Sequence, residues 1–510
     1  MTEENLQKEI IAFLAAPATH GGVPVRQFQT HISYVFLAAG LAYKIKRAVK
    51  FPYLDFSSLQ KRLAACLAEL EVNRRFSPRL YHRVVPITRE TDGSLAIVGS
   101  GAVVEWVVEM QRFDELATLD HLAIAGKIDN ALADQLGRLI AKAHFASRVA
   151  GAAAWIAELQ TYIERNQKVF AENPELFVPE NAAALCRLSQ AALKRLMPLL
   201  EKRGELDFIR QGHGDLHLGN IALIANQPVL FDAIEFDPLV ASGDVLYDLA
   251  FLLMDLIARG LQPAADIVLN RYLSEAGRDE NLEGLAALSF FLSLRAAIRA
   301  NVISAKLAMV PEVERPAIAR SAGQYFDFAC ALILPATPRL IAIGGLSGTG
   351  KSALASILAP AIPPAPGAIL LRSDSERKCQ FGVTETRKLA PEAYRDEVTA
   401  SVYAALAAKA RTILAAGHSV IVDAMFACPH ERCLIEDAAQ DFIFHGIFLQ
   451  ADLATRLRRV GLRVNDASDA GQEVVIRQES YDLGRLDWYI CDASGAPVDV
   501  AATARRALSL

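Results

Sequence analysis

The sequence contains no segment of the kind that crosses a membrane or directs export. No uninterrupted apolar run of about 18 residues occurs. The first ten residues, MTEENLQKEI, are acidic and polar, whereas a signal peptide is basic and then apolar. The most apolar helix that the pattern predicts, residues 245–257, contains Asp248 and Asp255, as a core helix of a soluble protein can. We therefore expect a cytoplasmic protein without a membrane partner.

The sequence also lacks an excess of basic residues and a framework of paired cysteines. Lys and Arg number 53 against 58 Asp and Glu, a net charge of -5, so no global positive field favours nucleic acid as a partner. The seven cysteines are scattered, which suits a reducing compartment. Cys428, His430 and Cys433 lie close together, but no second ligand pair follows at zinc-site spacing. Small molecules and nucleotides are the expected partners, and nothing in the sequence indicates an oligomeric state.

The length predicts more than one domain, because 510 residues, 52% of them hydrophobic, exceed what one core usually serves. Residues 1–335 form the first predicted domain, with strands and one helix over about 25–112 and mainly helices over about 113–335. Ser57-x-x-Gln60 predicts a capping box at the start of the early helix. Residues 336–510 form the second domain.

The stretch QGHGDLHLGN, residues 211–220, carries the chemistry of the first domain. His213, Asp215 and Asn220 have the H-x-D-x-x-x-x-N spacing of kinase catalytic loops, in which the Asp accepts the acceptor hydroxyl's proton and the Asn holds Mg²⁺. Asp232 ends an apolar run about a dozen residues later, where a kinase keeps its other Mg²⁺-binding Asp. We predict Asp215 as the catalytic base and Asn220 and Asp232 as metal ligands. His213 and His217 are interpreted as loop supports.

HGDLHLGN with its downstream Asp and the following GDVLYDLAFLL resembles the aminoglycoside phosphotransferase family of protein-kinase-like small-molecule kinases. The resemblance implies an α+β bilobal fold in which a strand lysine contacts the ATP phosphates and a helix carboxylate orients that lysine. Lys44 is the predicted lysine, with Lys46 on the same strand face as the alternative. Glu69 is the predicted carboxylate, with Glu71 as its alternative. The Gly-rich G-x-G-x-x-G loop of protein kinases is missing.

The second domain opens with a phosphate-binding loop. An apolar strand, LIAIGG, runs into G-x-x-x-x-G-K-S, the order of strand, loop and helix that a P-loop requires. Backbone N–H groups of such a loop converge on phosphate oxygens, while Lys351 reaches the outer phosphates and Ser352 ligates Mg²⁺. The predicted nucleotide-binding residues are Gly345, Leu346, Ser347, Gly348, Thr349, Gly350, Lys351, Ser352 and Ala353.

Residues beyond the loop resemble the small P-loop kinases with an α/β fold and a parallel sheet. Asp423 ends a strand as a Walker-B-like metal ligand. Asp374 follows another strand and is the predicted base for the acceptor hydroxyl, although its SDSER setting also allows a helix cap. A helix over residues 453–470 is predicted, and Arg459 and Arg463 on one face of it could reach the migrating phosphoryl group, or be a solvated surface.

These patterns predict an ATP- and Mg²⁺-dependent phosphotransferase with two kinase-type sites, acting on a hydroxyl of a small molecule. Two alternatives remain open. The C-terminal half could be a polynucleotide end kinase, for which Arg372, Arg377, Lys378, Arg387 and Lys388 would have to form a basic groove. The chain could also be a nucleotide-sensing regulatory protein in which one half is inactive.

Overall fold

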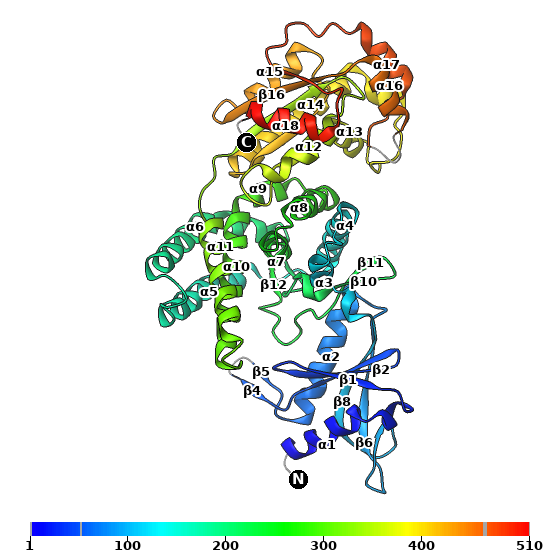
Figure 1. The fold of residues 1–510 in the computed structure, drawn as a ribbon, viewed down its shortest axis with the longest axis vertical. Coiled ribbons are helices and arrows are strands. Elements are labelled where there is room, and N and C mark those ends of the chain that lie inside the picture. Colours follow the sequence, from blue (N-terminus) through cyan, green and yellow to red (C-terminus); the bar gives the residue numbers. More distant parts are fainter. Residues whose placement is uncertain (1–2, 52–53, 463–466, 509–510) are drawn as a thin grey trace. The chain divides into compact units, whose positions relative to one another are not determined.

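The chain forms two compact units in the computed structural model, which describes residues 3–51, 54–462 and 467–508. The first unit joins Met1–Thr161 to Met197–Asp255, and the second joins Tyr162–Leu196 to Leu256–Leu510. The predicted boundary between residues 335 and 336 lies inside the second unit, between α11 (Arg315–Leu332) and β13 (Arg339–Gly345). Figure 1 labels the elements along the chain.

A six-stranded antiparallel sheet begins the first unit, in the order β1-β2-β3-β8-β6-β7. Helix α1 packs Ile10 against Ile45 and Val107 on one face, and helix α2 packs Cys66 near Val108 on the other. Alternate side chains of the predicted strands thus pack into two hydrophobic cores, one on each face of the sheet. The elements are α1 (Glu3–Ala15), β1 (Val25–Gln29), β2 (Ser33–Ala38), β3 (Leu41–Lys46), α2 (Leu59–Phe76), β6 (Tyr81–Arg89), β7 (Leu95–Ile97) and β8 (Ala102–Gln111).

Helix α2 does not start with the predicted capping box. Its N-cap is Ser58, whose hydroxyl accepts the N–H of Lys61 at 3.4 Å. Ser57 instead donates its hydroxyl to the Asp55 carboxylate at 2.5 Å. The cap therefore lies one residue later than predicted.

The remainder of the first unit holds two short strand pairs and the helices around them. The hairpin β10–β11 and the pair β9–β12 are both antiparallel. The segment between β9 and β10 is the predicted catalytic loop, and α7 follows β12 directly. The elements are α3 (Leu119–Ile124), α4 (Asn130–Ala146), β9 (Ile209–Gln211), β10 (Ile221–Ile224), β11 (Gln227–Leu230), β12 (Ser242–Asp244) and α7 (Val245–Ala258).

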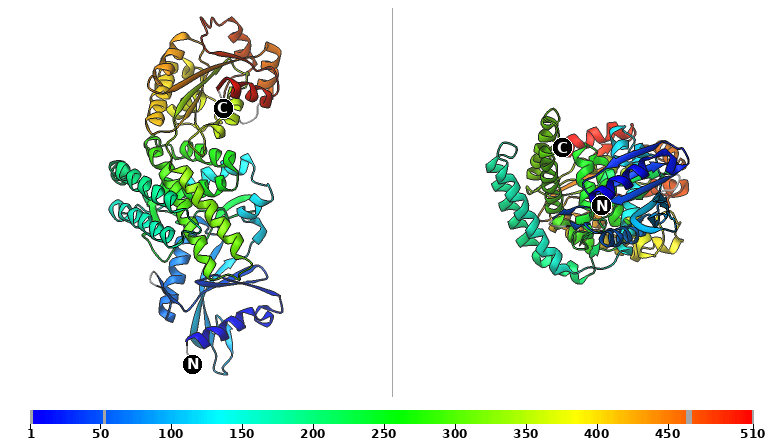
Figure 2. Two further views of the ribbon diagram at one scale, coloured as in Figure 1. Left: turned by 60° about the vertical axis from the view of Figure 1, so that its left-hand side comes forward. Right: turned by 90° about the horizontal axis from the view of Figure 1, so that it is seen from below.

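Helices open the second unit. The parts of α5 and α6 that belong to it lie side by side (Figures 1 and 2), and Phe170, Phe177 and Phe326 form an aromatic cluster with ring centroids 4.7–5.1 Å apart. The stretch Glu280–Ala308 is apolar and long enough to cross a membrane, but 67% of its window is buried, as in the core of a globular domain. The helices are α5 (Ala152–Glu172), α6 (Pro179–Glu205), α8 (Gln262–Ala276), α9 (Glu280–Gly284), α10 (Leu288–Ala305) and α11.

A five-stranded parallel sheet in the order β14-β15-β13-β16-β17 completes the second unit and confirms the predicted α/β fold. Leu354 of α12 and Val500 of α18 join the core on one face, and α14 contributes its own buried residues. The elements are β13, α12 (Lys351–Leu358), β14 (Ile369–Arg372), α13 (Ser373–Gln380), α14 (Asp396–Ala415), β15 (Val420–Asp423), α15 (Pro429–Asp437), β16 (Ile443–Gln450), α16 (Leu453–Gly461), α17 (Gln472–Arg477), β17 (Tyr489–Asp492) and α18 (Pro497–Leu508).

The predicted helix over residues 453–470 is shorter in the structure. Helix α16 ends at Gly461, and the next described helix, α17, begins at Gln472. Arg463 lies outside the described residues, so its predicted position on the Arg459 face is not part of the structure.

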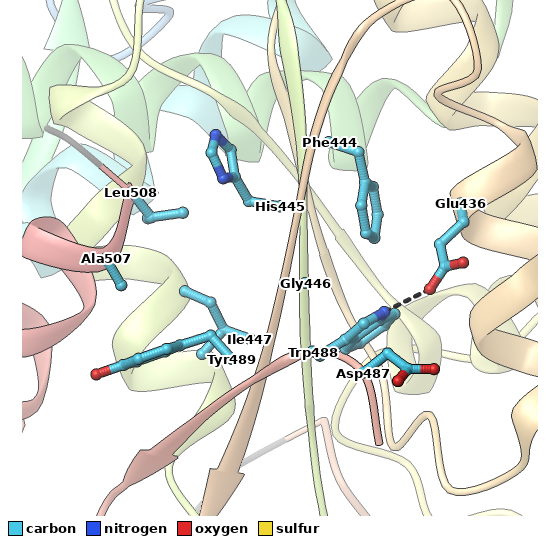
Figure 3. Close-up of a pocket in the computed structure, with 10 residues that line it drawn as sticks. All are labelled: Glu436, Phe444, His445, Gly446, Ile447, Asp487, Trp488, Tyr489, Ala507 and Leu508. Atoms are coloured by element: carbon cyan, nitrogen blue, oxygen red, sulfur yellow. Dashed lines mark hydrogen bonds between the residues drawn. The ribbon is translucent and has the colours of Figure 1, made fainter. Parts of the chain in front are cut away.

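A pocket of about 350 Å³ lies toward the amino-terminal ends of β16 and β17 (Figure 3). Trp488 donates its indole N–H to Glu436 at 2.6 Å and covers Gly446, where a Cβ would lie 2.3 Å from the indole ring. Ligands of open α/β sheets bind at the opposite, carboxyl ends of the strands. This aromatic pocket is therefore separate from the P-loop.

Candidate active sites

The predicted catalytic loop is held by two carboxylates of α7. Asp248 accepts the backbone N–H groups of His213 (2.8 Å) and Gly214 (2.9 Å), and Asp255 accepts that of Leu218 (3.1 Å). Gly214 has a left-handed φ of +79°, a backbone conformation in which a residue with a side chain would be strained. From the sequence, Asp248 and Asp255 are interpreted only as polar residues of a core helix. Their roles as loop anchors required the tertiary structure.

Asp215 and Asn220 are neighbours in this loop. Asn220 donates its amide to the Asp215 carboxylate and to the Asp215 carbonyl, both at 2.9 Å. Asn220 is buried, whereas the Asp215 side chain is 40% exposed. This geometry orients the carboxylate and leaves it accessible from solvent, which a base that meets a substrate requires.

The two histidines of the loop support it. Burial lowers the pKa of His213, despite the nearby carboxylates of Asp248 and Asp215, so the ring is neutral and its Nε2–H donates to the Phe231 carbonyl at 2.9 Å. His217 accepts the Gly219 N–H at 3.0 Å and packs against Phe251.

Asp232 has a left-handed backbone with φ +61°, which is uncommon for a residue with a side chain. Its N–H donates to the Tyr81 hydroxyl at 3.0 Å, and the next residue, Ala233, donates to Asn73 at 2.8 Å. These bonds fix the turn, and the Asp232 side chain remains 46% exposed. A strained residue held by its surroundings at this position fits a functional role.

A network of charged side chains joins Asp232 to the sheet. Lys44 contacts Asp232 at 2.6 Å and one Glu69 oxygen at 2.7 Å. Lys46 contacts the other Glu69 oxygen at 2.7 Å and also pairs with Glu235. Both lysines therefore reach the predicted helix carboxylate, and Lys44 is the one that also reaches the predicted metal ligand. Glu235 was not predicted from the sequence, because no motif marks it.

The ionisation of this network follows from its pairing. Burial alone would raise the pKa of Glu69, but the ammonium groups of Lys44 and Lys46 outweigh burial and lower it. Burial would lower the pKa of Lys44, but Asp232 and Glu69 hold it well above the ordinary value. The alternative carboxylate, Glu71, is 60% exposed and pairs instead with Arg75 and Arg148.

The P-loop of the second unit connects β13 to α12, as predicted. Gly345, Gly348 and Gly350 all have positive φ values, of +142°, +88° and +96°. A Cβ on Gly348 would lie 2.6 Å from the Arg456 carbonyl, so glycine is needed for space as well as conformation. Ser347 donates its N–H to Gln478, and Thr349 donates its hydroxyl to the Leu346 carbonyl. Leu346 and Ala353 flank this turn and the start of α12.

The predicted metal ligands of the second site lie together. Ser352 donates its hydroxyl to Asp423 at 2.5 Å, and Arg372 contacts Ser352 at 3.1 Å and Asp423 at 3.5 Å. Strand pairing explains this, because Arg372 and Asp423 are register partners at the carboxyl ends of β14 and β15. Among the described residues, no group of three His, Cys, Asp or Glu side chains could hold a metal ion alone. A cation at Ser352 and Asp423 would therefore need phosphate or water oxygens as further ligands.

Asp374 lines a pocket of about 720 Å³ together with Lys351, Ser352 and Asp423. It is the second residue of α13, whose N-cap is Arg372, so Asp374 is not the N-cap. Burial raises the pKa of Asp374, the Asp423 charge raises it further, and Lys351 opposes both. A carboxyl with a raised pKa at the end of a strand beside a P-loop fits a general base.

Asp469 lines the same pocket and was not predicted from the sequence. Asp469 accepts from Lys378 (3.0 Å), from the Leu389 N–H (2.8 Å) and from the Tyr394 hydroxyl (2.8 Å). Arg377 is buried, donates to the Ala393 carbonyl and lies 4.9 Å from the Tyr394 ring centroid. Asp469 thereby fastens the segment 381–395 beside Asp374. No sequence motif marks Asp469.

Two arginines of α16 contact the P-loop. Arg456 is buried and donates to the Ser347 carbonyl at 3.0 Å and to Gln478 at 3.2 Å. Arg459 donates to the Thr349 carbonyl at 3.2 Å and to the Gly495 carbonyl at 2.9 Å. Arg459 lines the pocket, so it belongs to the site rather than to a purely solvated helix surface.

Comparisons with known proteins agree with this arrangement. Residues 53–288 match the family model of the phosphotransferase enzyme family, and residues 340–481 match that of an AAA domain. Both resemblances inferred from the sequence are thus confirmed, and both regions are kinase-type domains that support phosphotransferase activity. Over 476 residues the chain is 26% identical to the uncharacterized protein Rv2004c of Mycobacterium tuberculosis, covering 90% of this chain and 91% of that protein.

Solved kinases are similar to each region. A choline/ethanolamine kinase family protein from Mesorhizobium loti covers 64% of this chain and 94% of its own, with 14% identity and a TM-score of 0.37. A gluconokinase from Sinorhizobium meliloti covers 34% of this chain and 92% of its own, with 19% identity and a TM-score of 0.26. Similarity at this level carries no statement about the substrate.

Proposed function

We propose that the chain is a bifunctional, ATP- and Mg²⁺-dependent kinase of the cytoplasm, in which each site transfers a phosphoryl group to a hydroxyl of a small molecule. The observation that supports the proposal is that each region contains its own set of candidate groups. The first contains a base candidate with an oriented carboxylate, two metal-ligand candidates and a paired lysine. The second places a P-loop, a metal-ligand pair and a base candidate around one pocket.

In the first site, Asp215 would accept the proton of the acceptor hydroxyl, with its carboxylate oriented by the amide of Asn220. Asn220 and Asp232 would offer oxygen ligands to Mg²⁺, whose positive charge would stabilise the charge of the phosphoryl group during transfer. Lys44 would contact the phosphates while Glu69 keeps it in place. The exposed Asp215 and Asp232 side chains are consistent with a site that solvent and ligands can reach.

In the second site, the P-loop N–H groups and Lys351 would hold the ATP phosphates, and Ser352 and Asp423 would hold Mg²⁺. Asp374 would take the acceptor proton, and Arg377 would contact an anionic part of the acceptor, since its buried guanidinium lines the same pocket. A small polar acceptor suits this lining, which combines Tyr394, Lys388 and Asp469 with those groups.

One pair of variants in the full chain tests whether there are two independent sites. Asp215→Asn should abolish transfer by the first half and Lys351→Ala transfer by the second, and each half should retain its activity when the other is changed. The measurement is phosphate transfer from labelled ATP to a library of metabolites and antibiotics. Loss of both activities in either folded single variant would contradict the proposal of two independent sites and favour a regulatory role for one half.

A further inference from the structure

Helix α8 and the start of α9 contact the part of the P-loop domain formed by β14, α13 and residues 381–395. This part carries Asp374 and Arg377, the groups proposed to meet the acceptor, and we call it the acceptor side. The helices belong to the region that matches the phosphotransferase family model, residues 53–288, yet they make directional polar contacts with residues 360–409. We infer that the segment 262–279 is a built part of the second site, and that Arg271 is a positioning residue for its acceptor side. The inference rests on the proposed function of the P-loop domain.

The first contact is at the edge of the parallel sheet. Strand β14 is an edge strand whose partner in the sheet is β15. On the β14 backbone, Asn270 accepts the Leu370 N–H at 2.7 Å and donates to the Ala368 carbonyl at 3.3 Å. One carboxamide thus supplies the acceptor and the donor that a neighbouring strand would have supplied. The strand that leads into Asp374 is therefore fixed on its outer side by α8.

The chain of the P-loop domain approaches α8 closely just before that strand. A Cβ on Gly367 would lie 2.3 Å from an Asp266 carboxyl oxygen and 2.6 Å from the Ala359 carbonyl. Gln262, one turn earlier on α8, donates to the Pro360 carbonyl at 2.7 Å. The glycine is what permits this contact, so the P-loop domain is shaped to receive the helix.

The second contact reaches the acceptor loop, residues 381–395, which contributes Lys388, Leu389, Pro391 and Tyr394 to the pocket. Arg271 pairs with the Glu385 carboxylate at 2.7 Å. The Glu385 carbonyl accepts from Lys378 at 2.6 Å. Arg271 therefore fixes the loop from outside, while Asp469 fixes it from the pocket side.

The third contact reaches α13, which carries Asp374 and Arg377. Lys409 of α14 contacts Asp279 at 3.0 Å and Glu376 of α13 at 2.8 Å. Strand β14, helix α13 and the acceptor loop are thus each tied to the segment 262–279. The ties are to the acceptor side, whereas the P-loop itself is held by α16 and Gln478. The segment should affect how the acceptor is presented and leave ATP binding unchanged.

Hydrogen exchange in the full chain tests the tie through a charge swap. Arg271→Glu and Glu385→Arg should each speed amide exchange in peptides spanning 381–395 by about tenfold, and the double swap should return it to within about twofold of the parent. Asn270→Ala should speed exchange at Leu370. Arg138→Glu, which breaks a local pair with Asp134 on α4, is the matched control and should leave both regions unchanged. Unchanged exchange in the single variants, or a swap that does not restore it, would overturn the inference.

Turnover separates a positioning role from a merely structural one. In an Asp215→Asn background, Arg271→Glu should lower the kcat of ATP hydrolysis about tenfold with KM for Mg-ATP unchanged, and the swap should restore kcat. If KM and kcat move together, the positioning role is wrong. If the background has no ATP hydrolysis that Lys351→Ala removes, the proposed function of the second half fails, while the exchange experiment still decides the contact. Arg271→Gln repeats both measurements should the charge reversal prevent folding.

Discussion

The two candidate sites differ in how their charges are arranged before any ligand binds. In the first, the lysine expected at the phosphates already neutralises the carboxylate expected at Mg²⁺, through the pair of Lys44 and Asp232. In the second, Ser352 holds the metal-ligand candidate Asp423, and the base candidate Asp374 is partly buried near the negative charge of Asp423. In the proposed reaction, Mg-ATP would separate the Lys44–Asp232 ion pair in the first site. In the second site, where Asp423 already lies 3.5 Å from Arg372, it would add positive charge beside two carboxyls.

In the proposed function, two sites for the same class of reaction thus differ in how their charged side chains are paired before a ligand binds. A self-paired site keeps its groups ionised without ligand, because each charge has a partner. A site with adjacent carboxyls raises the pKa of one of them until a cation arrives. The following variants test this difference.

Asp374→Asn gives the largest expected effect. Transfer by the second half should fall about 10²–10⁴-fold, because the base is lost while little volume changes. Stability should not fall, since Asp374 is not the N-cap and its ionised form is disfavoured by burial. Labelled-phosphate transfer and thermal unfolding measure the two quantities, and ATP binding serves as the control. A fully active variant would exclude the base role.

Replacing the two lysines of the first site one at a time should show that Lys46 contributes mainly to stability and Lys44 mainly to activity. Lys46 is fully buried between Glu69 and Glu235, so Lys46→Met should cost about 3–5 kcal/mol of unfolding free energy by leaving buried carboxylates uncompensated. Lys44→Met should cost less stability, because Asp232 is half-exposed, but should lower turnover of the first half. Denaturant unfolding measures the first effect. Adding Glu235→Gln to Lys46→Met should recover part of the loss, and equal costs for both lysines would contradict the assignment.

The pH dependence of the second half should show the raised pKa of Asp374. A base must be ionised, so kcat/KM should fall as pH decreases through a pKa above the ordinary Asp value. The sign for stability is opposite: because the folded-state pKa is raised, the folded state binds the proton more tightly, and protonation of Asp374 at low pH stabilises the fold. The Asp374→Asn variant, assayed at residual activity, should lose this acid limb. If the Asp374→Asn variant keeps the acid limb, a group other than Asp374 causes it.

Arg459→Ala should have the smallest effect. Its guanidinium contacts backbone carbonyls on the P-loop and at Gly495, so turnover of the second half should fall about tenfold, equivalent to about 1.4 kcal/mol, with a smaller change in ATP affinity. Steady-state kinetics give both values. Unchanged turnover and affinity would show that Arg459 is only a solvated residue of the helix surface.

Motifs with fixed spacing could be predicted because local chain geometry determines them. The P-loop glycines lie within a few residues of one another, as do Asp215 and Asn220, so a local turn is enough to bring each set together. The end of α16 could not be predicted, since the arginine-rich pattern continues beyond Gly461. The predicted cap of α2 was one residue too early, because Ser57 and Ser58 are both of a type that caps helices and the local pattern does not distinguish them.

The sequence alone determined both kinase-type regions, the residues of the two loops and the strands that precede the P-loop, Asp374 and Asp423, since these depend on period, spacing and turn chemistry. Only the tertiary structure decided which carboxylates hold those loops. Asp248 and Asp255 anchor the first loop from α7, and Asp469 anchors the acceptor loop across 75–80 residues of chain. It also decided that Asn270 completes a sheet edge 100 residues away. Such partners are chosen by packing between distant segments, which leaves no local pattern in the sequence.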